Sequence, residues 1–382
     1  MSLAASFTFE TTARIVCEDG ASARLSAIMA SVTGDAAARR VLLVTDAGLV
    51  SAGVTDRVTA ALKQDGHAVV LFDAVTADPP EACVMQGLAA AQDCDVVIGL
   101  GGGSSLDCAK LIALLARTPQ PLESLYGIGL ARGPRLPLIQ VPTTAGTGSE
   151  VTPIAIVTTP DDQKKGVVSP LLLPDVAVLD AELTLGLPPA VTAMTGVDAM
   201  VHAIEAYTSR HRKNPVSDAL AVAALKLLHA HIERAVSHGQ DIEARRAMLQ
   251  GSLLAGMAFA NAPVAAVHAL AYPVGGIFHV PHGLSNALVL VPVMRFNLPG
   301  CEPLYGELSA HLGLDGTGEA LVDEMARLVA AMPMAQRLGE VGVERQHLDR
   351  LAHDAMQVTR LLVNNPREVS LADARALYEQ AL

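Results

Sequence analysis

The pattern of apolar positions changes about halfway along the chain. In the first half, short runs that are apolar throughout alternate with longer segments of helical periodicity. Such runs are typical of strands in a parallel sheet whose two faces are both covered by helices. The predicted strands are residues 41–45, 68–72, 95–100, 136–141, 154–158 and 176–179, and the predicted helices are residues 49–65, 80–93 and 104–117.

A different pattern begins at Pro188-Pro189, where strand-like runs disappear and long segments rich in Ala and Leu take over. Proline is tolerated in the first turn of a helix, which does not use the missing N–H group. Helices are predicted at residues 189–209, 215–237, 241–260, 263–277, 317–331, 346–363 and 370–381, with interruptions that include Pro281 and Pro299. The sequence therefore predicts an α/β parallel-sheet domain over residues 1–187 and an all-helical domain over residues 188–382.

Composition and charge narrow the classes of function. The 382 residues are 51% hydrophobic and 17% charged, which is typical of packed domains and not of disorder. A net charge of −12 repels phosphodiester backbones and anionic bilayers, and 3% aromatic residues leave few rings to stack on bases. Charged residues interrupt every long apolar stretch, so no membrane span is predicted. We expect neither nucleic acid nor a membrane as a partner.

Cysteine usage bears on the compartment. The five cysteines are an odd number without a Cys-x-x-Cys pair, which favours reduced thiols over a disulfide framework. The first residues, MSLAASFTFETTARIV, do not have the basic start and long apolar stretch of a secretory signal. A cytoplasmic location is the expectation.

Two loops of small residues follow predicted strands and indicate a phosphate site. The segment Gly101-Gly102-Gly103-Ser104-Ser105 leads from a strand into a helix, where backbone N–H groups and the helix dipole attract an anion. Residues 142–152 (PTTAGTGSEVT) follow the next strand, and open α/β sheets bind ligands at such carboxyl ends. Together the loops favour a dinucleotide, although ordinary structural turns of Gly, Ser and Thr are the alternative.

Asp46 directly follows the strand predicted at residues 41–45. A carboxylate there can accept a hydrogen bond from an adenosine ribose and repel a 2′-phosphate, which favours NAD over NADP. A helix cap is an equally good explanation, because Asp is among the best capping residues.

Four residues of the second half suggest a metal site. Asp198 and His202 are four residues apart and share one face of a predicted helix, although such a pair alone indicates no more than a local hydrogen bond. His268 and His282 lie in apolar segments that favour neutral imidazole over imidazolium. Three imidazoles and a carboxylate suit Fe2+ or Zn2+. His279 is a competing candidate, three residues before His282.

These residues, in this order, resemble the iron-containing (group III) alcohol dehydrogenase family, whose relatives include glycerol dehydrogenase and dehydroquinate synthase. The resemblance covers nearly the whole chain through VTDAGL, GGGSS, PTTAGTGSEVT, LLPDVAVLD, GVDAMVHAIEAY and HVPHGLSNALVL. It implies a Rossmann-like NAD-binding domain, a helical metal-binding domain and a homodimer or higher homo-oligomer.

The resemblance also implies roles for individual residues. The metal ligands would be Asp198, His202, His268 and His282. The NAD contacts would be Asp46, Asp78, Gly102, Gly103, Ser104, Asp107, Thr143, Thr144, Thr152 and Lys164. The chain departs from the family at Tyr272, because many members carry a second histidine four residues after the one matching His268. Tyr272 then replaces that histidine in relaying a proton, or water and the cofactor ribose relay it, or Tyr272 only packs; a phenol pKa near 10 is poorly suited to relay.

The expected reaction passes a hydride between a metal-bound alcohol and NAD in a cleft between the domains, with aldehyde reduction in reverse. Ile154, Met257 and Phe259 are expected to line an apolar pocket for unbranched alcohols. Residues 210–213 (RHRK) leave open an acidic substrate, such as maleylacetate or a hydroxy acid, although a solvated helix end also explains them. A dehydroquinate synthase-like lyase and a non-catalytic NAD-binding protein are the rivals.

Overall fold

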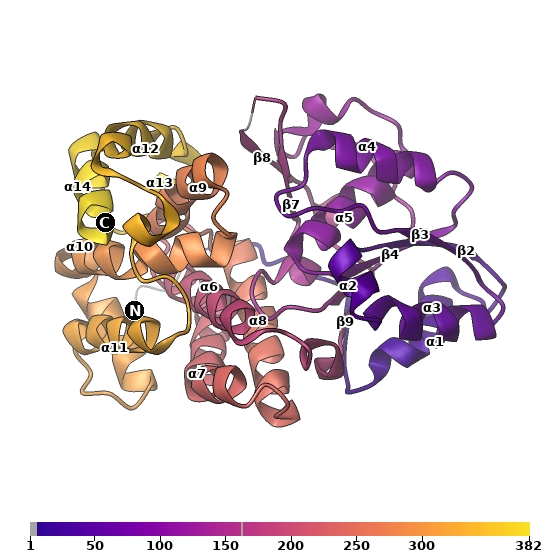
Figure 1. Ribbon diagram of the computed structural model, residues 1–382, viewed down its shortest axis with the longest axis horizontal. Coiled ribbons are helices and arrows are strands. Elements are labelled where there is room, and N and C mark those ends of the chain that lie inside the picture. The colour runs from indigo at the N-terminus through magenta and orange to yellow at the C-terminus, as the bar shows by residue number, and fades with distance from the viewer. Residues whose placement is uncertain (1–5, 162) are drawn as a thin grey trace. The chain divides into compact units, whose positions relative to one another are not determined.

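A six-stranded parallel sheet forms from the apolar runs of the first half (Figure 1). The structure is a computed structural model that describes residues 6–161 and 163–382. The strand order is β1-β9-β6-β4-β2-β3, and every neighbouring pair is parallel. These strands are β1 (Arg14–Cys17), β2 (Arg40–Val44), β3 (Ala68–Phe72), β4 (Val96–Gly101), β6 (Leu138–Pro142) and β9 (Val176–Leu179).

Helices cover both faces of this sheet, which explains why its strands are apolar throughout. Successive side chains of a strand point to opposite faces. Val41 and Leu43 of β2 belong to one core with residues of α1 (Leu25–Thr33) and α3 (Val54–Gln64). Leu42 and Val44 belong to the other core, with residues of α4 (Glu81–Ala90) and α5 (Gly103–Arg117).

This half differs from the prediction in several features, among them α1, for which no helix was predicted. β1 was not predicted, because it is a short edge strand whose side chains are mostly exposed. Residues 154–158 form a strand as predicted, but this strand, β7 (Ile154–Thr158), pairs antiparallel with β8 (Lys164–Val168) in a separate sheet with β5 (Gly127–Ile128). The single helix predicted at residues 49–65 is two helices, α2 (Ala47–Ser51) and α3, because Gly53 adopts a left-handed φ of 71° between them.

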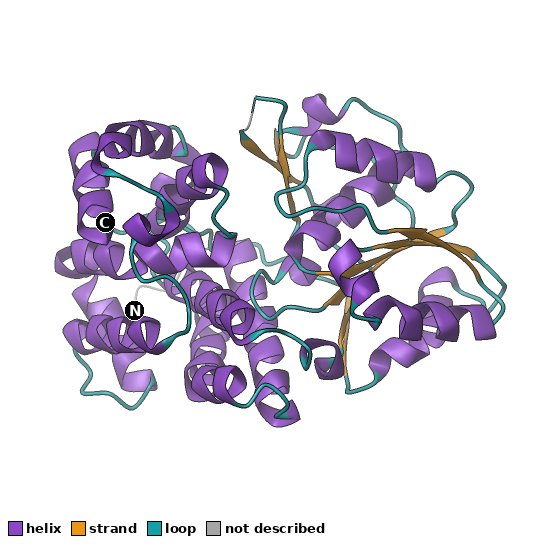
Figure 2. Cartoon of the chain, viewed as in Figure 1, coloured by secondary structure: helices purple, strands orange, loops and turns teal. Residues whose placement is uncertain are grey.

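Helices make up the second half, and all the strands lie in the first half (Figure 2). The helices are α6 (Pro189–Tyr207), α7 (Pro215–Ser237), α8 (Ile242–Asn261), α9 (Ala266–Phe278), α10 (His282–His311), α11 (Gly318–Ala331), α12 (Leu348–Met356), α13 (Thr359–Leu362) and α14 (Leu371–Ala381). Local signals place their starts. The Asn214 side chain, for example, accepts a hydrogen bond from Ser217 N, and Pro215 occupies the first turn of α7.

The helix α10 was missed, and the interruption predicted at Pro299 is wrong. Three prolines lie inside this helix, and an internal proline costs about 3 kcal/mol through its missing N–H and a steric clash. Buried apolar side chains such as Val289, Leu290 and Val293 offset that cost, because each stabilises by about 1.5–3 kcal/mol when removed from water. The helix predicted at residues 346–363 is also interrupted, between α12 and α13.

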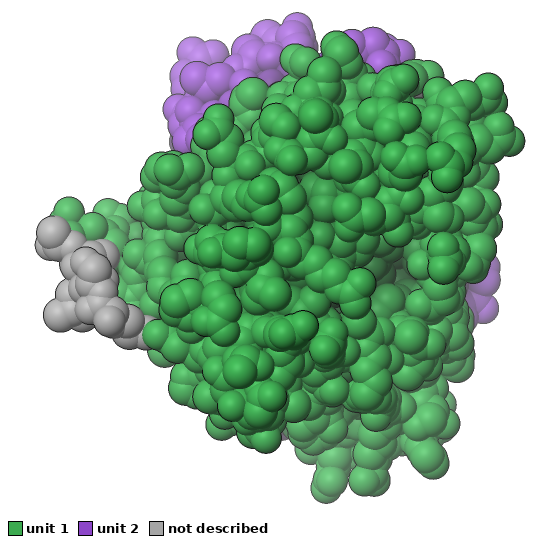
Figure 3. Space-filling model, turned by 90° about the vertical axis from the view of Figure 1, so that its left-hand side faces the viewer, with its two compact units in different colours: residues 1–9, 187–382 green, residues 10–186 purple. Residues whose placement is uncertain are grey.

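The chain divides into two compact units (Figure 3). The sheet unit is Glu10–Gly186, and the helical unit is Leu187–Leu382 together with residues 6–9 of the described chain. The division falls one residue before the predicted boundary, and residues 6–9 belong to the helical unit although they were expected in the sheet domain. Among the described residues, no single helix has the length and apolar composition to cross a bilayer; α8 and α9 reach them only as a pair bent by 105°.

Candidate functional site

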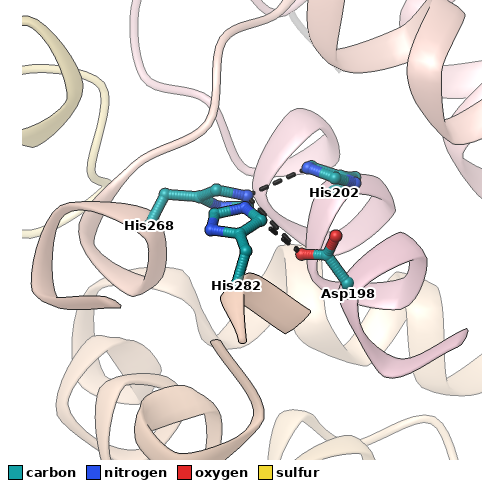
Figure 4. A group of neighbouring side chains, drawn as sticks. All are labelled: Asp198, His202, His268 and His282. Carbon is teal, nitrogen blue, oxygen red and sulfur yellow. Dashed lines mark hydrogen bonds and ion pairs between the residues drawn. The ribbon is translucent and has the colours of Figure 1, made fainter. Parts of the chain in front are cut away.

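Four polar side chains from three helices converge inside the helical unit (Figure 4). α6 carries Asp198 and His202, α9 carries His268, and His282 is the first residue of α10. One potential ligand atom of each lies within 4.8 Å of the others. His268 Nε2 is 2.9 Å from His202 Nε2 and 3.9 Å from Asp198 Oδ1, and His282 Nε2 is 3.7 Å from Asp198 Oδ1. We call these four residues the His/Asp cluster.

The rings of the His/Asp cluster are held by packing. The His202 ring stacks on Phe259, with centroids 4.2 Å apart, and on His268, with centroids 4.7 Å apart. Three of the four residues are buried, whereas the His282 side chain is 31% exposed. The exposed side of the cluster is therefore at His282.

The donor set fits a divalent transition metal. Ligand atoms about 2.0–2.2 Å from a tetrahedral ion lie about 3.3–3.6 Å from one another. The separations of 2.9, 3.7 and 3.9 Å within the cluster are close to that spacing. Burial alone would raise the pKa of Asp198, but the neighbouring imidazoles of the cluster and a hydrogen bond from Asn286 bring it below its usual range. The carboxylate is thus ready to bind a cation. The buried Asn286 Oδ1 has no hydrogen-bond partner, which adds an unused oxygen beside the cluster.

Sequence reasoning missed two residues that contact this cluster. Asn286 Nδ2 donates to Asp198 Oδ1 at 2.6 Å and lies 3.2 Å from Nε2 of both His268 and His282. Glu205 accepts a hydrogen bond from His268 Nδ1 at 2.7 Å. Helical spacing was the available signal, because Glu205 is three residues after His202 and Asn286 is four residues after His282.

Other candidates lie elsewhere. His279 is exposed, has a left-handed φ of 55° and is not in the His/Asp cluster. Tyr272 lies beside the cluster, with its ring 6.0 Å from that of His282 between centroids, and its Oη accepts a hydrogen bond from Arg360 at 3.3 Å. In the basic segment at residues 210–213, Lys213 pairs with Asp218 at 2.7 Å, so part of its charge is neutralised within the chain.

The two small-residue loops meet in the sheet unit, because they follow the adjacent strands β4 and β6. Gly102 precedes α5 and Gly103 begins it. A Cβ on Gly103 would lie 2.8 Å from Thr147 Cγ2, and one on Gly102 would lie 3.5 Å from Thr144 Oγ1. The close approach of the two loops therefore favours glycine at position 103, whereas the distance at Gly102 is an ordinary contact. Ser104, in the first turn of α5, lies at the same edge of the sheet as the threonine loop.

The carboxylates of the predicted cofactor site have partners within the chain. Asp46 Oδ1 accepts a hydrogen bond from Leu49 N and caps α2, so the helix-cap interpretation is observed. This does not test a ribose contact. Asp78 has a left-handed φ of 50°, and its Oδ1 forms an ion pair with Lys164 Nζ at 2.7 Å. The structure thus brings together two residues that are 86 positions apart.

Asp107 and Thr152 belong to a buried network around Lys110, which sequence reasoning did not single out as functional. Lys110 Nζ donates to Ser149 Oγ at 2.8 Å, Thr152 Oγ1 at 3.2 Å and Ile154 O at 2.7 Å. Asp107 lies 3.6 Å from Lys110 Nζ and accepts hydrogen bonds from Ser149 Oγ and Ile156 N. We call these four residues, Asp107, Lys110, Ser149 and Thr152, together with the buried Glu150, whose charge acts on Lys110, the lysine network.

Burial dominates the electrostatics of the lysine network. It lowers the pKa of Lys110 and raises that of Asp107, in each case against the attraction between the two. Burial also raises the pKa of Glu150 to about 7, and Glu150 Oε1 has no hydrogen-bond partner. Asp107 and Thr152 therefore help to support the threonine loop, whatever contacts they make with a cofactor.

Comparison with known proteins places the chain in a family. Residues 12–181 match the model "Iron-containing alcohol dehydrogenase", and residues 192–382 match "Fe-containing alcohol dehydrogenase family, C-terminal". Long-chain-alcohol dehydrogenase 1 of Geobacillus thermodenitrificans (strain NG80-2) is 42% identical over 356 residues, which are 90% of each chain.

Solved structures agree. A 1,3-propanediol oxidoreductase superposes with a TM-score of 0.93 at 34% identity, covering 99% of this chain and 100% of that one. A sulfoacetaldehyde reductase from Bifidobacterium kashiwanohense in complex with NAD+ gives 0.90 at 27% identity, covering 99% of each chain.

This chain belongs to the iron-containing alcohol dehydrogenase family. It is an oxidoreductase that acts on alcohols, as the sequence predicted. The predicted fold, a parallel-sheet domain followed by a helical domain, is also confirmed. The roles of individual residues stay predictions.

Proposed function

We propose that this chain oxidises unbranched primary alcohols with NAD, and reduces the matching aldehydes with NADH, at a divalent ion held by the His/Asp cluster. The observation that carries the proposal is the convergence of four potential ligand atoms within 4.8 Å. A divalent ion bound there lowers the pKa of an alcohol hydroxyl and polarises a carbonyl. The donor set and the name of the family favour Fe2+, with Zn2+ as the alternative.

The chain supplies orientation and a dry environment around the ion. His268 is held by Glu205, the His202 ring by Phe259, and Asp198 by Asn286, so each of three proposed ligands has a fixed direction. The half-buried ring of Phe259 also offers an apolar surface beside the cluster, which suits an alkyl chain better than a polyol. The reaction removes a hydride from the alcohol carbon to the nicotinamide and releases the hydroxyl proton.

NAD is the proposed cofactor. The backbone N–H groups of Gly102, Gly103 and Ser104 at the start of α5 are suited to the diphosphate, because the helix dipole adds positive potential there. Thr143 and Thr144 follow the neighbouring strand. Thr152, Asp107, Asp78 and Lys164 complete the proposed set of contacts.

Asp46 provides the test of NAD against NADP. A carboxylate at the end of β2 repels a 2′-phosphate, so we propose that kcat/KM is higher with NAD. Asp46→Asn removes the charge but keeps a good helix cap. It should lower the ratio of kcat/KM with NAD to kcat/KM with NADP about tenfold or more, without loss of stability. An unchanged preference would remove Asp46 from the cofactor site.

The proposed reaction is tested with metal-free protein, reloaded with Fe2+ or Zn2+ and mixed with NAD and a series of primary alcohols. Net NADH accumulation that requires the ion supports it. A lyase of the dehydroquinate synthase type would turn over without net NADH, and a binding protein would not turn over. Full turnover by protein without bound metal would refute the metal-dependent mechanism.

One observation favours a second candidate function, reduction of aldehydes that carry an anionic group. Arg360 is exposed, donates to Tyr272 beside the His/Asp cluster, and has no carboxylate within ion-pairing distance among the described residues. A guanidinium is well suited to a carboxylate or sulfonate. The relative solved with NAD+ is a sulfoacetaldehyde reductase, although that substrate belongs to that protein.

The two candidates separate by substrate. Arg360→Gln should lower kcat/KM for an anionic aldehyde about tenfold if the guanidinium binds its charged end, and it should leave kcat/KM for an uncharged aldehyde of equal length unchanged.

Tyr272→Phe tests proton relay. The variant keeps the ring and loses the hydroxyl, so kcat falls only if the phenol carries the proton or orients the substrate. Equal rates for both proteins would leave Tyr272 a packing residue.

Location and assembly are also proposed. The five cysteines are free thiols in the structure, which supports the cytoplasm as the compartment. A homodimer is proposed from the family resemblance. Among the described strands, β1 pairs with β9 alone, so its other edge offers backbone groups with which a second copy could pair. Light scattering on the purified protein decides between a monomer and an oligomer.

A further inference from the structure

Glu205 is a buried carboxylate that accepts hydrogen bonds from the beginning of one helix and from the side chain of a proposed metal ligand. It lies on α6, is 4% exposed, and accepts three hydrogen bonds. Oε2 accepts from Ala265 N at 3.0 Å and from His268 Nδ1 at 2.7 Å, and Oε1 accepts from Val267 N at 2.7 Å. All three donors come from one short segment, 60 to 63 residues further along the chain.

The two backbone contacts provide the cap that α9 otherwise lacks. The residue before this helix is Ala265, whose side chain cannot accept a hydrogen bond from the first turn. An uncapped, buried helix start leaves N–H groups without partners. Glu205 satisfies two of them from a neighbouring helix, and its negative charge lies at the positive end of the α9 dipole. The position of the α9 backbone is thus tied to α6.

The contact with His268 determines which ring nitrogen carries the proton. An ionised carboxylate only accepts hydrogen bonds, so Nδ1 of His268 must be the protonated nitrogen. The lone pair of neutral His268 is then on Nε2, which faces His202 and Asp198. Without Glu205 the other tautomer, with a proton on Nε2 pointing into the cluster, would compete with cation binding.

We propose that Glu205 is a positioning residue of the metal centre, which sets the cation affinity by fixing both the tautomer of His268 and the place of the α9 start. This inference rests on the proposed role of His268 as a ligand and adds a residue outside the ligand set. Carboxylates that accept from the second nitrogen of a metal-binding histidine raise its basicity, and their loss costs about 10–100-fold in metal affinity.

The test measures Co2+ binding by metal-free protein, using the visible absorption of the bound ion and competition with a chelator. Glu205→Gln keeps the shape but removes the charge and replaces one acceptor oxygen by an NH2 group, so it loses either the contact with His268 Nδ1 or the contact with Val267 N at the α9 start. We expect its affinity for Co2+ to fall about 10–100-fold and its absorption band to shift. Glu205→Asp keeps the charge on a shorter side chain and should recover part of the affinity. Thermal unfolding of each metal-free variant shows whether it is folded.

A control is Glu307→Gln, which removes an exposed carboxylate of α10 that accepts a hydrogen bond from Tyr207 Oη at 2.5 Å. Tyr207, like Glu205, lies on α6. This variant should bind Co2+ as the unmodified protein does. Glu205→Gln protein that is folded and binds Co2+ within twofold of the unmodified protein, with the same spectrum, would overturn the proposal. If that variant does not fold, unchanged affinity and spectrum in Glu205→Asp overturn it.

Failure of the proposed ligand set looks different. In that case the unmodified protein would bind no Co2+, or would bind it equally well after His268→Ala. Both results are independent of any variant of Glu205. Weak binding confined to the Glu205 variants therefore supports the positioning role, whereas absence of binding in the unmodified protein rejects the ligand set on which it rests.

Discussion

Two of the buried polar groups, the lysine network in the sheet unit and the His/Asp cluster in the helical unit, differ in whether they contain their own cation. The lysine network contains its own cation: the three hydrogen bonds donated by Lys110 use the capacity of an ammonium group, and Asp107 is paired in return. The His/Asp cluster consists of a carboxylate and three imidazoles that present lone pairs to one point. A network with an internal cation stabilises structure, whereas a set of acceptors without one is suited to binding an ion.

The largest expected effect comes from removing a member of the His/Asp cluster. His282→Ala is the cleanest choice, because that side chain is 31% exposed and its loss leaves a small cavity. Loss of a ligand removes the electrostatic stabilisation by the ion, roughly 5 kcal/mol, which is several thousandfold in kcat/KM. Metal content by elemental analysis should fall in parallel.

Two comparisons check that result. The free energy of unfolding of metal-free His282→Ala protein should lie within about 1 kcal/mol of that of the metal-free unmodified protein, because the cluster stabilises the fold mainly when it holds a cation. His229→Ala, which removes a histidine that pairs with Glu324 on α11, should keep both metal and activity. Equal metal content in His282→Ala and the unmodified protein would show that His282 is not a ligand.

The lysine network should respond in the opposite way. Lys110→Met leaves the buried Asp107 without its cation, and breaking a buried pair typically costs about 4 kcal/mol of unfolding free energy. Urea unfolding measures that loss, while metal content of the folded fraction should not change. Lys63→Met, at an exposed position in the last turn of α3, is the control. A loss below about 1 kcal/mol for Lys110→Met would mean that its hydrogen bonds contribute little.

The sequence predicted some strands, helices and site residues and missed others. Strands such as β2 and β4 are apolar at every position because helices cover both faces, so their pattern was sufficient. β1 is an exposed edge strand and α10 contains three prolines, so local rules failed where burial and packing outweighed them. Helix spacing placed Asp198 and His202 on one face, and the family motifs pointed to the other two members of the cluster.

The partners of those residues were harder to predict. Glu205 and Lys110 were not singled out, because what they do depends on hydrogen bonds with segments 39 or more residues away, which no local pattern encodes. Acidic and basic residues on helices are usually solvated, so buried ones can be recognised only once the fold is known. Asp46 shows the converse: its role as a cap is local, and the sequence already suggested it.

Glu150 predicts a pH dependence of stability. Its pKa is raised to about 7 in the folded protein from 4.5, so the folded state binds the proton more tightly than the unfolded state. The stabilisation by this proton is fully present below about pH 4.5 and is lost as the pH rises through about 7, a change of up to about 3 kcal/mol. Glu150→Gln imitates the neutral carboxyl and should not show this loss. Its stability advantage should therefore grow between about pH 5 and 8 in urea unfolding experiments; a constant difference would place the carboxylate in contact with a cation.

The smallest effect is expected at Asn286, which touches the His/Asp cluster without being one of its four members. Asn286→Ala removes the hydrogen bond to Asp198, so Co2+ affinity should fall about tenfold, as for other partners of metal ligands. It also removes the unpartnered Oδ1, so the free energy of unfolding of the metal-free protein should change by less than about 1 kcal/mol.

The control is Asn297→Ala on the same helix, which breaks a reciprocal amide pair with Asn365. That control should destabilise the protein and keep its metal affinity. If Asn286→Ala behaves like Asn297→Ala instead, this amide belongs to the packing of α10 and not to the ion site.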